Sequence, residues 1–253
     1  MSTENLAAVI LAAGKGTRMK SEQPKVLHQI AGQPLALYPV QWCQSLGCQK
    51  TVMVIGHQAE RVKETFAPYP VDFVVQEQQL GTGHALMVTE SALQSFSGTL
   101  LLLCGDVPLL REETLRHLVA THQTSQAAVT VLTTEMENPY GYGRIIRRSG
   151  QIEKIVEEKD ATSEEKQVTE INTGIYAFQA PLVFELLHRI GNDNAQGEYY
   201  LTDIISLAQS SGLKAAACLL EDPRECMGIN DRVQLSQAGE ILRQRINHQH
   251  MIN

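Results

Sequence analysis

The sequence is poor in aromatic residues and in positive charge. Phe, Trp and Tyr make up only 5% of its 253 residues, whereas 43% are hydrophobic, so the core must consist mainly of aliphatic side chains. The net charge is -7 at pH 7, which leaves no overall positive field to neutralise a nucleic-acid backbone. We therefore expect no nucleic-acid partner. Any phosphate bound by this chain must be a small ligand held by local cations and backbone amides.

Cysteines are few, and long apolar runs are lacking. The five cysteines include no CxxC pair and no Cys/His cluster with zinc-ligand spacing, and such thiols are typical of a reducing cytoplasm. The apolar segment Leu6–Ala13 lacks the basic leader of a signal peptide and continues directly into Gly14. No run approaches the length that spans a bilayer. The sequence predicts a cytoplasmic protein that has no membrane partner.

Short aliphatic runs alternate with helical patterns through the first half of the chain. The strand-length runs are Leu6–Ala12, Thr51–Ile55, Val71–Val75 and Thr99–Cys104. Helical spacing is found at Leu35–Leu46, Ala59–Phe66 and Gly83–Leu93. Near-continuous apolar runs suit strands buried on both faces, so the pattern predicts an α/β fold with an open, mostly parallel, Rossmann-like sheet. Ligands of such sheets bind at the carboxyl ends of the strands.

The pattern changes after about Met136. Short strands at 141–144, 152–156 and 171–178 predict a small β-rich lobe, inserted on the same sheet and facing the substrate. We expect a helix at 199–210, a strand at 214–219 and a long amphipathic helix from Asp231 to about Asn247, with Asn230 or Asp231 as its N-cap. Residues 1–229 are then the main domain and 230–253 a C-terminal helical linker.

A glycine-rich loop follows the first strand. Residues 11–19 read LAAGKGTRM, and Lys25 comes shortly after. Glycines let a backbone approach a ligand closely, and Lys15, Arg18 and Lys25 can supply the mobile cations that a triphosphate requires. The spacing excludes a P-loop, and Met19 stands where a dinucleotide fingerprint needs Gly or Ala. On spacing alone, a phosphate site and a plain tight turn remain equally good interpretations.

Polar residues also follow two further strands. Gln76 carries an amide that can read a uracil ring, and Gly81 permits close backbone approach beside the Thr82 hydroxyl, although the same loop could simply cap a helix with Thr82 as N-cap. Gly105 and Asp106 follow the fourth strand. A carboxylate fixed there can hold Mg²⁺, which uses one or two protein carboxylates together with phosphate oxygens. The alternative is that Asp106 caps a helix beginning near Glu112.

Taken together, these segments resemble the sugar-phosphate nucleotidyltransferases. The first loop is similar to their L-x-A-G-x-G-T-R-M signature followed by P-K, and the Gln76 loop to the Q-x-x-x-x-G-T-[AG]-H-A segment of uridyltransferases. Cys104 stands where the family often has an aromatic residue before Gly-Asp. Later matches are P-x-G-Y-G-R at 139–144, V-E-x-K-D-A at 156–161, E-I-N-T-G at 170–174 and G-[VI]-N at 228–230. The resemblance extends from Leu11 to Asn230, and it is to the uridyltransferase domain of the bacterial bifunctional N-acetylglucosamine-1-phosphate uridyltransferase/glucosamine-1-phosphate acetyltransferases.

The resemblance implies a fold of the nucleotide-diphospho-sugar transferase type and a Mg²⁺-dependent reaction. UTP and N-acetylglucosamine 1-phosphate would give UDP-N-acetylglucosamine, a precursor of peptidoglycan and lipopolysaccharide, and pyrophosphate. It implies catalytic roles for Arg18 on the pyrophosphate and Lys25 on the α-phosphate or sugar phosphate, and it makes Asp106 and Asn230 the metal ligands. The implied substrate-binding residues are Leu11, Ala12, Ala13, Gly14, Lys25, Gln76, Gly81, Thr82, Gly105, Asp106, Gly143, Glu157, Asn172 and Asn230.

Two alternatives remain open. A sister nucleotidyltransferase would use another base or sugar, and a non-catalytic nucleotide-sugar sensor would use the same fold without turnover. Members of the family continue into a left-handed β-helix that carries acetyl transfer and assembles trimers. No hexapeptide repeats occur before Asn253, so we expect neither acetyltransferase activity nor a trimer built on that domain.

Overall fold

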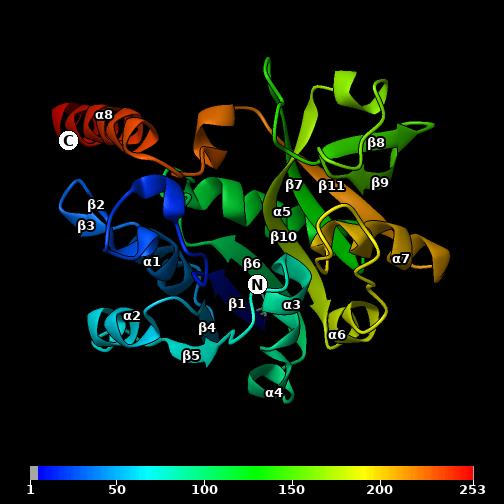
Figure 1. The fold of residues 1–253 in the computed structure, drawn as a ribbon, viewed down its shortest axis with the longest axis horizontal. Helices are drawn as coiled ribbons and strands as arrows, with labels where there is room; N and C mark the ends of the chain where they lie inside the picture. Colours follow the sequence, from blue (N-terminus) through cyan, green and yellow to red (C-terminus); the bar gives the residue numbers. More distant parts are fainter. Residues whose placement is uncertain (1–4, 253) are drawn as a thin grey trace.

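A central sheet organises the molecule in the computed structural model, which describes residues 5–252. Nine strands form this sheet in the order β11-β7-β10-β6-β1-β4-β5, and β8 and β9 extend it beside β10 (Figure 1). The strands are β1 (Leu6–Leu11), β4 (Lys50–Ile55), β5 (Asp72–Val75), β6 (Gly98–Cys104), β7 (Val129–Glu135), β8 (Arg144–Arg148), β9 (Gln151–Val156), β10 (Glu170–Ala180) and β11 (Ala215–Leu220). A separate small hairpin joins β2 (Gln29–Ile30) to β3 (Gln33–Pro34).

Most neighbouring strands on the main path of the sheet run parallel. β1 lies between β4 and β6 and is parallel to both, β5 is parallel to β4, and β11 is parallel to β7. β10 interrupts this arrangement because it pairs antiparallel with both β6 and β7. The predicted open, mostly parallel sheet is therefore confirmed, and the fold is of the mixed α/β class.

Helices cover both faces of the sheet (Figure 1). They are α1 (Leu37–Ser45), α2 (Ala59–Phe66), α3 (Thr82–Met87), α4 (Glu90–Leu93), α5 (Glu112–Ser125), α6 (Leu182–Leu187), α7 (Ile204–Ser210) and α8 (Arg232–Ile252). Alternate residues of β1 enter two different cores: Ala8 and Ile10 pack with α1, α2 and α5, whereas Ala7 and Val9 pack with α3, α6 and α7. A strand buried on both faces needs this continuous apolar run, which is why its sequence shows no polar alternation.

The C-terminal helix packs on a third, smaller core beside the β2–β3 hairpin. Ala238 of α8 is buried there together with Ile30, Leu35, Leu109 and Ile229. Asp231 is the N-cap, since its carboxylate accepts the backbone N–H of Gln234 at 2.8 Å. The helix continues to Ile252, beyond the predicted end near residue 247.

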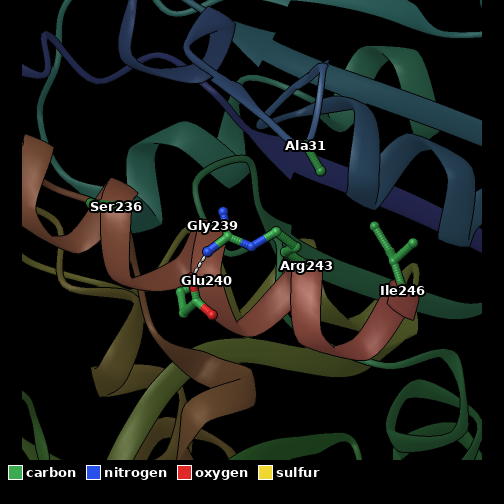
Figure 2. Close-up of a pocket in the computed structure, with 6 residues that line it drawn as sticks. All are labelled: Ala31, Ser236, Gly239, Glu240, Arg243 and Ile246. Carbon is green, nitrogen blue, oxygen red and sulfur yellow. Dashed lines mark ion pairs between the residues drawn. The ribbon is translucent and has the colours of Figure 1, made fainter. Parts of the chain in front are cut away.

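A hollow of about 380 Å³ separates α8 from the hairpin (Figure 2). It is lined by Ala31, Ser236, Gly239, Glu240, Arg243 and Ile246. Arg243 pairs with Glu240 along the helix, and none of the predicted site residues lies here. The proposed boundary at residue 230 falls just before α8. The outer ends of the two proposed segments, residues 1–4 and 253, lie outside the described residues.

The predicted helices and strands need three corrections. The strand expected at 141–144 is wrong: residues 140–143 form a turn in which the N–H of Tyr142 donates to the Pro139 carbonyl at 3.2 Å, and β8 begins only at Arg144. The helix expected at 83–93 is broken between α3 and α4, where the Thr89 hydroxyl donates back to the Leu86 carbonyl at 2.7 Å. The helix expected at 199–210 starts later, after a 3-10 turn at Leu201–Asp203.

The inserted lobe is a hairpin. β8 and β9 pair antiparallel, and Arg144 of β8 pairs with Ile171 of β10, so the lobe continues the main sheet. Across residues 5–252, no helix combines the length and apolarity needed to span a membrane.

Candidate functional site

A cavity of about 400 Å³ opens at the carboxyl ends of β1, β5 and β6. Its lining comprises Leu11, Ala12, Ala13, Gly14, Lys25, Val26, Gln76, Gln79, Gly81, Thr82, Ala85, Cys104, Asp106 and Glu198. Most of the residues predicted from the glycine-rich loop, the Gln76 loop and the Gly-Asp pair are therefore brought to one place. This is also where an open parallel sheet places its ligands.

The glycine-rich loop is fixed at its start and open at its tip. The N–H of Ala12 donates to the Val54 carbonyl at 2.8 Å, which holds the end of β1 against β4. Gly14 is exposed, and a Cβ there would meet nothing within 4 Å. Gly16 has φ of 60°, and a Cβ there would lie 2.6 Å from the Lys25 Cβ. Only glycine suits that backbone and lets Lys25 pass so close.

Lys25 joins two oxygens from distant parts of the chain. Its ammonium forms an ion pair with Asp106 and donates to Asn230 Oδ1 at 3.1 Å. The N–H of Ile229 donates to the Asp106 backbone carbonyl at 2.9 Å, which holds the two oxygen-bearing segments together. The Lys25 and Asp106 side chains are only 15% and 20% exposed, so water screens the pair incompletely.

The same two oxygens fit a divalent cation. A carboxylate and a side-chain amide carbonyl already face a common positive charge, and Mg²⁺ takes such oxygen ligands with phosphate oxygens and water completing its shell. No group of three His, Cys, Asp or Glu side chains arranged for a metal occurs within residues 5–252. A site of the Mg²⁺–phosphate type does not need one. The alternative role of Asp106 is excluded, since α5 begins at Glu112 and the capping position before it is Arg111.

The Gln76 loop is held by buried hydrogen bonds. Gln76 is 4% exposed; its amide nitrogen donates to the Gly81 carbonyl at 3.2 Å and lies 3.0 Å from His84 Nδ1. Gly81, not Thr82, occupies the N-cap position of α3, and no side chain caps this helix. The interpretation of the loop as a Thr82 cap is therefore wrong, and Thr82 lines the cavity instead.

The residues predicted from the later motifs form a second cluster. The N–H of Asn172 donates to the Gly143 carbonyl at 2.8 Å, and a Cβ on Gly143 would lie 3.6 Å from Glu157 Oε1. Glu157 accepts a hydrogen bond from the Thr202 hydroxyl at 3.0 Å. Burial, aided by the acidic neighbour Asp160 and others, raises the pKa of the Glu157 carboxyl.

Cys104 links the two clusters. It lines the cavity, and its thiol donates to the Gly174 carbonyl at 3.6 Å. The N–H of Gly174 in turn donates to Asn172 Oδ1 at 2.9 Å. Burial, with Asp106 adding to it, raises the pKa of the Cys104 thiol to about 12. Cys104 is therefore a neutral wall of the cavity and not a nucleophile.

Arg18 and Gly105 lie outside the cavity lining, as do the residues predicted from the later motifs: Gly143, Glu157, Asn172 and Asn230. Arg18 is exposed on the 3-10 turn Thr17–Met19 and borders a separate shallow hollow together with Asp231 and Arg232. The positive charge of Arg18 still affects the Tyr142 hydroxyl. Burial raises the pKa of Tyr142, and the Arg18 charge reduces this rise. Gly105 is buried, and its N–H donates to the Leu11 carbonyl at 2.9 Å, which holds β6 to the end of β1.

The structure adds two polar residues that sequence reasoning missed. Gln79 donates from its amide nitrogen to the Ala13 carbonyl at 2.6 Å and so ties the Gln76 loop to the glycine-rich loop. Glu198 lines the cavity from a distant loop, where the neighbouring Tyr199 carbonyl accepts the N–H of Gly83 at 2.8 Å. Gln79 lies inside a motif that was recognised, so its position was the available signal. Glu198 lies within residues 194–203, which also closely resemble a segment of the family, so its position was likewise the available signal.

Comparison with known proteins matches residues 8–171 to the family described as the MobA-like NTP transferase domain. Over 247 residues the chain is 62% identical to the bifunctional protein GlmU of Syntrophotalea carbinolica, and over 251 residues it is 54% identical to that of Geobacter metallireducens. Each match covers 98% of this chain and 53% of the relative. The chain thus spans about half the length of the curated relatives it matches.

Solved structures share the fold at low sequence identity. A UDP-glucose pyrophosphorylase complexed with UDP-glucose superposes with a TM-score of 0.75 at 19% identity, covering 95% of this chain and 99% of the other. A Bacillus anthracis protein described as a glucose-1-phosphate thymidylyltransferase gives a TM-score of 0.76 at 18% identity, covering 93% and 94% of the two chains. These matches support the nucleotidyltransferase type of α/β fold.

Proposed function

Because this chain belongs to the family of MobA-like NTP transferase domains, we propose that it transfers a uridylyl group from UTP to N-acetylglucosamine 1-phosphate. The products are UDP-N-acetylglucosamine and pyrophosphate. The observation that carries this proposal is the position of Lys25, whose ammonium contacts Asp106 and Asn230 beside a glycine-rich loop. Lys25 and Asp106 line a cavity of about 400 Å³, and Asn230 contacts Lys25, so a cation and two oxygen ligands lie together where a nucleotidyl group could be transferred.

The Gln76 loop supports uracil as the base. The amide nitrogen of Gln76 is already committed to the Gly81 carbonyl and His84, so its amide oxygen is the group that can accept the ring N–H of uracil. The two carbonyl oxygens of the uracil ring would then accept hydrogen bonds from backbone N–H groups of the Gln76 loop and the glycine-rich loop. Gln79 keeps these loops in register through its bond to Ala13.

The second cluster supports an N-acetylated sugar. Asn172 Oδ1 accepts the Gly174 N–H, which leaves its amide nitrogen to donate to an acyl carbonyl. One Glu157 oxygen accepts the Thr202 hydroxyl, and the other can accept a sugar hydroxyl. The two side chains thus offer one donor and one acceptor in fixed positions, which suits a ligand with an acetamido group and free hydroxyls.

Transfer would proceed by in-line attack of the sugar-phosphate oxygen on the α-phosphorus of UTP. Lys25 would move its ammonium onto the α-phosphate or sugar phosphate, and Arg18 with the Gly14 backbone would hold the departing pyrophosphate. Asp106 and Asn230 would hold Mg²⁺, which when bound supplies electrostatic stabilisation of the phosphate charge. The positions of these residues require no covalent enzyme intermediate. Five free thiols suit the reducing cytoplasm in which we place the reaction.

The test is pyrophosphate release from purified protein with Mg²⁺, UTP and N-acetylglucosamine 1-phosphate. Parallel reactions contain CTP, dTTP or glucose 1-phosphate, and one contains EDTA. Metal-dependent release only with UTP and the N-acetylated sugar supports the proposal. Release with another pair would overturn the base or sugar assignment, and no release with any pair would favour a sensor.

A matched pair of variants tests the role of Asp106. Asp106→Ala should lose roughly 100-fold or more of kcat because an electrostatic contact to the transferring group is gone. Asp72→Ala removes an exposed carboxylate at the amino end of β5, whereas the cavity lies at the carboxyl end of that strand. This variant should keep its activity. Equal activity of the two variants would contradict the assignment of Asp106.

A further inference from the structure

Two cysteines lie side by side where α1 ends, away from the candidate site. The N–H of Cys48 donates to the Cys43 carbonyl at 2.9 Å, and the N–H of Gly47 donates to the Gln44 carbonyl at 3.1 Å. With Gly47 at φ 74°, this is the Schellman ending of a helix. In this ending the residue after the glycine commonly packs its side chain against the residue whose carbonyl it bonds, and Cys48 packs against the core cluster that contains Cys43.

The two thiols differ in accessibility and in acidity. Cys43 is 0% exposed beneath α1, whereas Cys48 is partly exposed and packs against the same core cluster. A hydrogen bond between the thiols raises the pKa of Cys43 well above its ordinary value, and burial adds to this rise. The same hydrogen bond lowers the pKa of Cys48, against the effect of burial. Cys48 is therefore the more acidic of the two thiols.

Cys48 opens onto a polar cavity of about 410 Å³. The other lining residues are Gln44, Gln49, Lys50, Thr51, Tyr69, Pro70, Val71 and Asp72. Lys50 and Asp72, which both line this cavity, form an ion pair at 3.4 Å. The cavity has room for a small reagent, which could reach Cys48 but not the buried Cys43.

We propose that Cys43 and Cys48 form a redox-active dithiol that is oxidised by small aliphatic disulfides. The Cys48 thiolate attacks one sulfur of the small disulfide; a mixed disulfide forms and the first small thiolate leaves, taking up a proton. The Cys43 thiol then loses its proton to solvent and its sulfur attacks Cys48 Sγ. This closes the Cys43–Cys48 disulfide and releases the second small thiolate, which is protonated in turn. Two protein thiols are oxidised and one small disulfide is reduced to two thiols.

This proposal does not depend on the proposed function. Cys48 precedes β4, at the amino end of that strand, whereas the candidate site lies at the carboxyl ends of the strands. Failure of uridylyl transfer would leave the thiol chemistry unaffected, and the reverse also holds.

The test uses the full chain, 2-hydroxyethyl disulfide as probe, an acid quench and tryptic digestion without reductant. Cys43 and Cys48 fall in one tryptic peptide, residues 26–50, which contains no other cysteine. In the wild type this peptide should lose two hydrogens and retain no adduct, and dithiothreitol should reverse the change. Cys43→Ala should instead accumulate the mixed disulfide on Cys48, and Cys48→Ser should leave the peptide unmodified.

The remaining cysteines serve as controls in the same molecule. Burial raises the pKa of Cys104, Cys218 and Cys226, so each should react roughly tenfold more slowly than Cys48 or slower still. A stable adduct on the wild-type peptide, rapid modification of the Cys48→Ser variant, or comparable rates at all cysteines would each overturn the proposal. Cys43→Val, which keeps the buried position apolar, replaces Cys43→Ala if thermal unfolding shows that the alanine variant does not fold.

Discussion

Lys25 and a divalent cation compete for the same two oxygens, and this competition can be measured without substrate. The Lys25 ammonium contacts both Asp106 and Asn230, so a metal that binds these oxygens must displace it. Hydrogen bonds to charged groups contribute about 1.5–3 kcal/mol. Taking the lower figure, because both side chains keep some exposure, Lys25→Gln should bind Mn²⁺ roughly tenfold more tightly than the wild type, since about 1.4 kcal/mol is a factor of ten.

The assay is titration of the free Mn²⁺ electron paramagnetic resonance signal at low ionic strength, with no nucleotide present. Lys20→Gln removes a nearby exposed positive charge and controls for the general field of the protein. It should tighten binding much less, and Asp106→Asn should weaken it. Equal affinities of Lys25→Gln and the wild type would refute the idea that the ammonium and the metal share these oxygens. The same Lys25→Gln variant should turn over more slowly, because the ammonium is lost from the phosphate.

Three further perturbations test other parts of the structure. Burial lowers the pKa of His122 to about 4, so stability should fall between pH 6.5 and 4, and His122→Gln should escape about 3 kcal/mol of that loss in urea unfolding. The raised pKa of Glu157 means that ionisation of this carboxyl opposes folding. The Glu157→Gln variant should therefore have a higher melting temperature than the wild type at pH 7 but not at pH 4. Its kcat/KM for the sugar phosphate should be roughly tenfold lower. Gly83→Ala should destabilise the chain by about 1–3 kcal/mol, because its Cβ would lie 2.7 Å from the Tyr199 carbonyl oxygen. Gly239 lies in α8, and a Cβ there would meet nothing closer than 3.9 Å. Gly239→Ala should therefore stabilise the chain by about 0.5–1 kcal/mol.

Controls for these perturbations lie close by in the structure. His117 is on the same helix as His122 but exposed, and His117→Gln should show the wild-type dependence of stability on pH. Parallel loss of stability in the two histidine variants would contradict the burial argument. A Glu157→Gln variant that melts lower than the wild type at pH 7 would show that the bond from Thr202 outweighs the cost of the buried charge. Equal urea midpoints for the two glycine variants would exclude the backbone clash at Gly83.

The strands of the first half could be predicted because burial on both faces leaves a continuous apolar run. β1, β4, β5 and β6 were each found in this way. β7 was not, because its run from Val129 to Glu135 carries three buried threonines. Two of the hydroxyls are satisfied: Thr134 donates to the Leu220 carbonyl at 2.9 Å, and Thr130 lies 2.9 Å from His122 Nδ1. Such partners come from other elements, and no local pattern shows them.

The candidate site was predictable in parts, for a similar reason. Residues at strand ends, such as Gln76 and Asp106, follow from the geometry of a parallel sheet. Asn230 meets Lys25 across 205 positions of sequence, and only a resemblance to a family indicated that these segments converge. Glu198 lies within residues 194–203, which resemble a family segment, but no local pattern showed that this irregular loop reaches the cavity.

The antiparallel strand β10 has a consequence for synthesis of the chain. β6 is complete at Cys104, but the strand that covers its edge arrives only with Glu170–Ala180. Until the ribosome has added about 75 further residues, which takes roughly 4–15 s at 5–20 residues per second, the apolar edge of β6 has no partner. An unpaired apolar edge is a template for pairing with other chains. The nascent protein should therefore be most prone to aggregate, and most dependent on chaperones, during this interval.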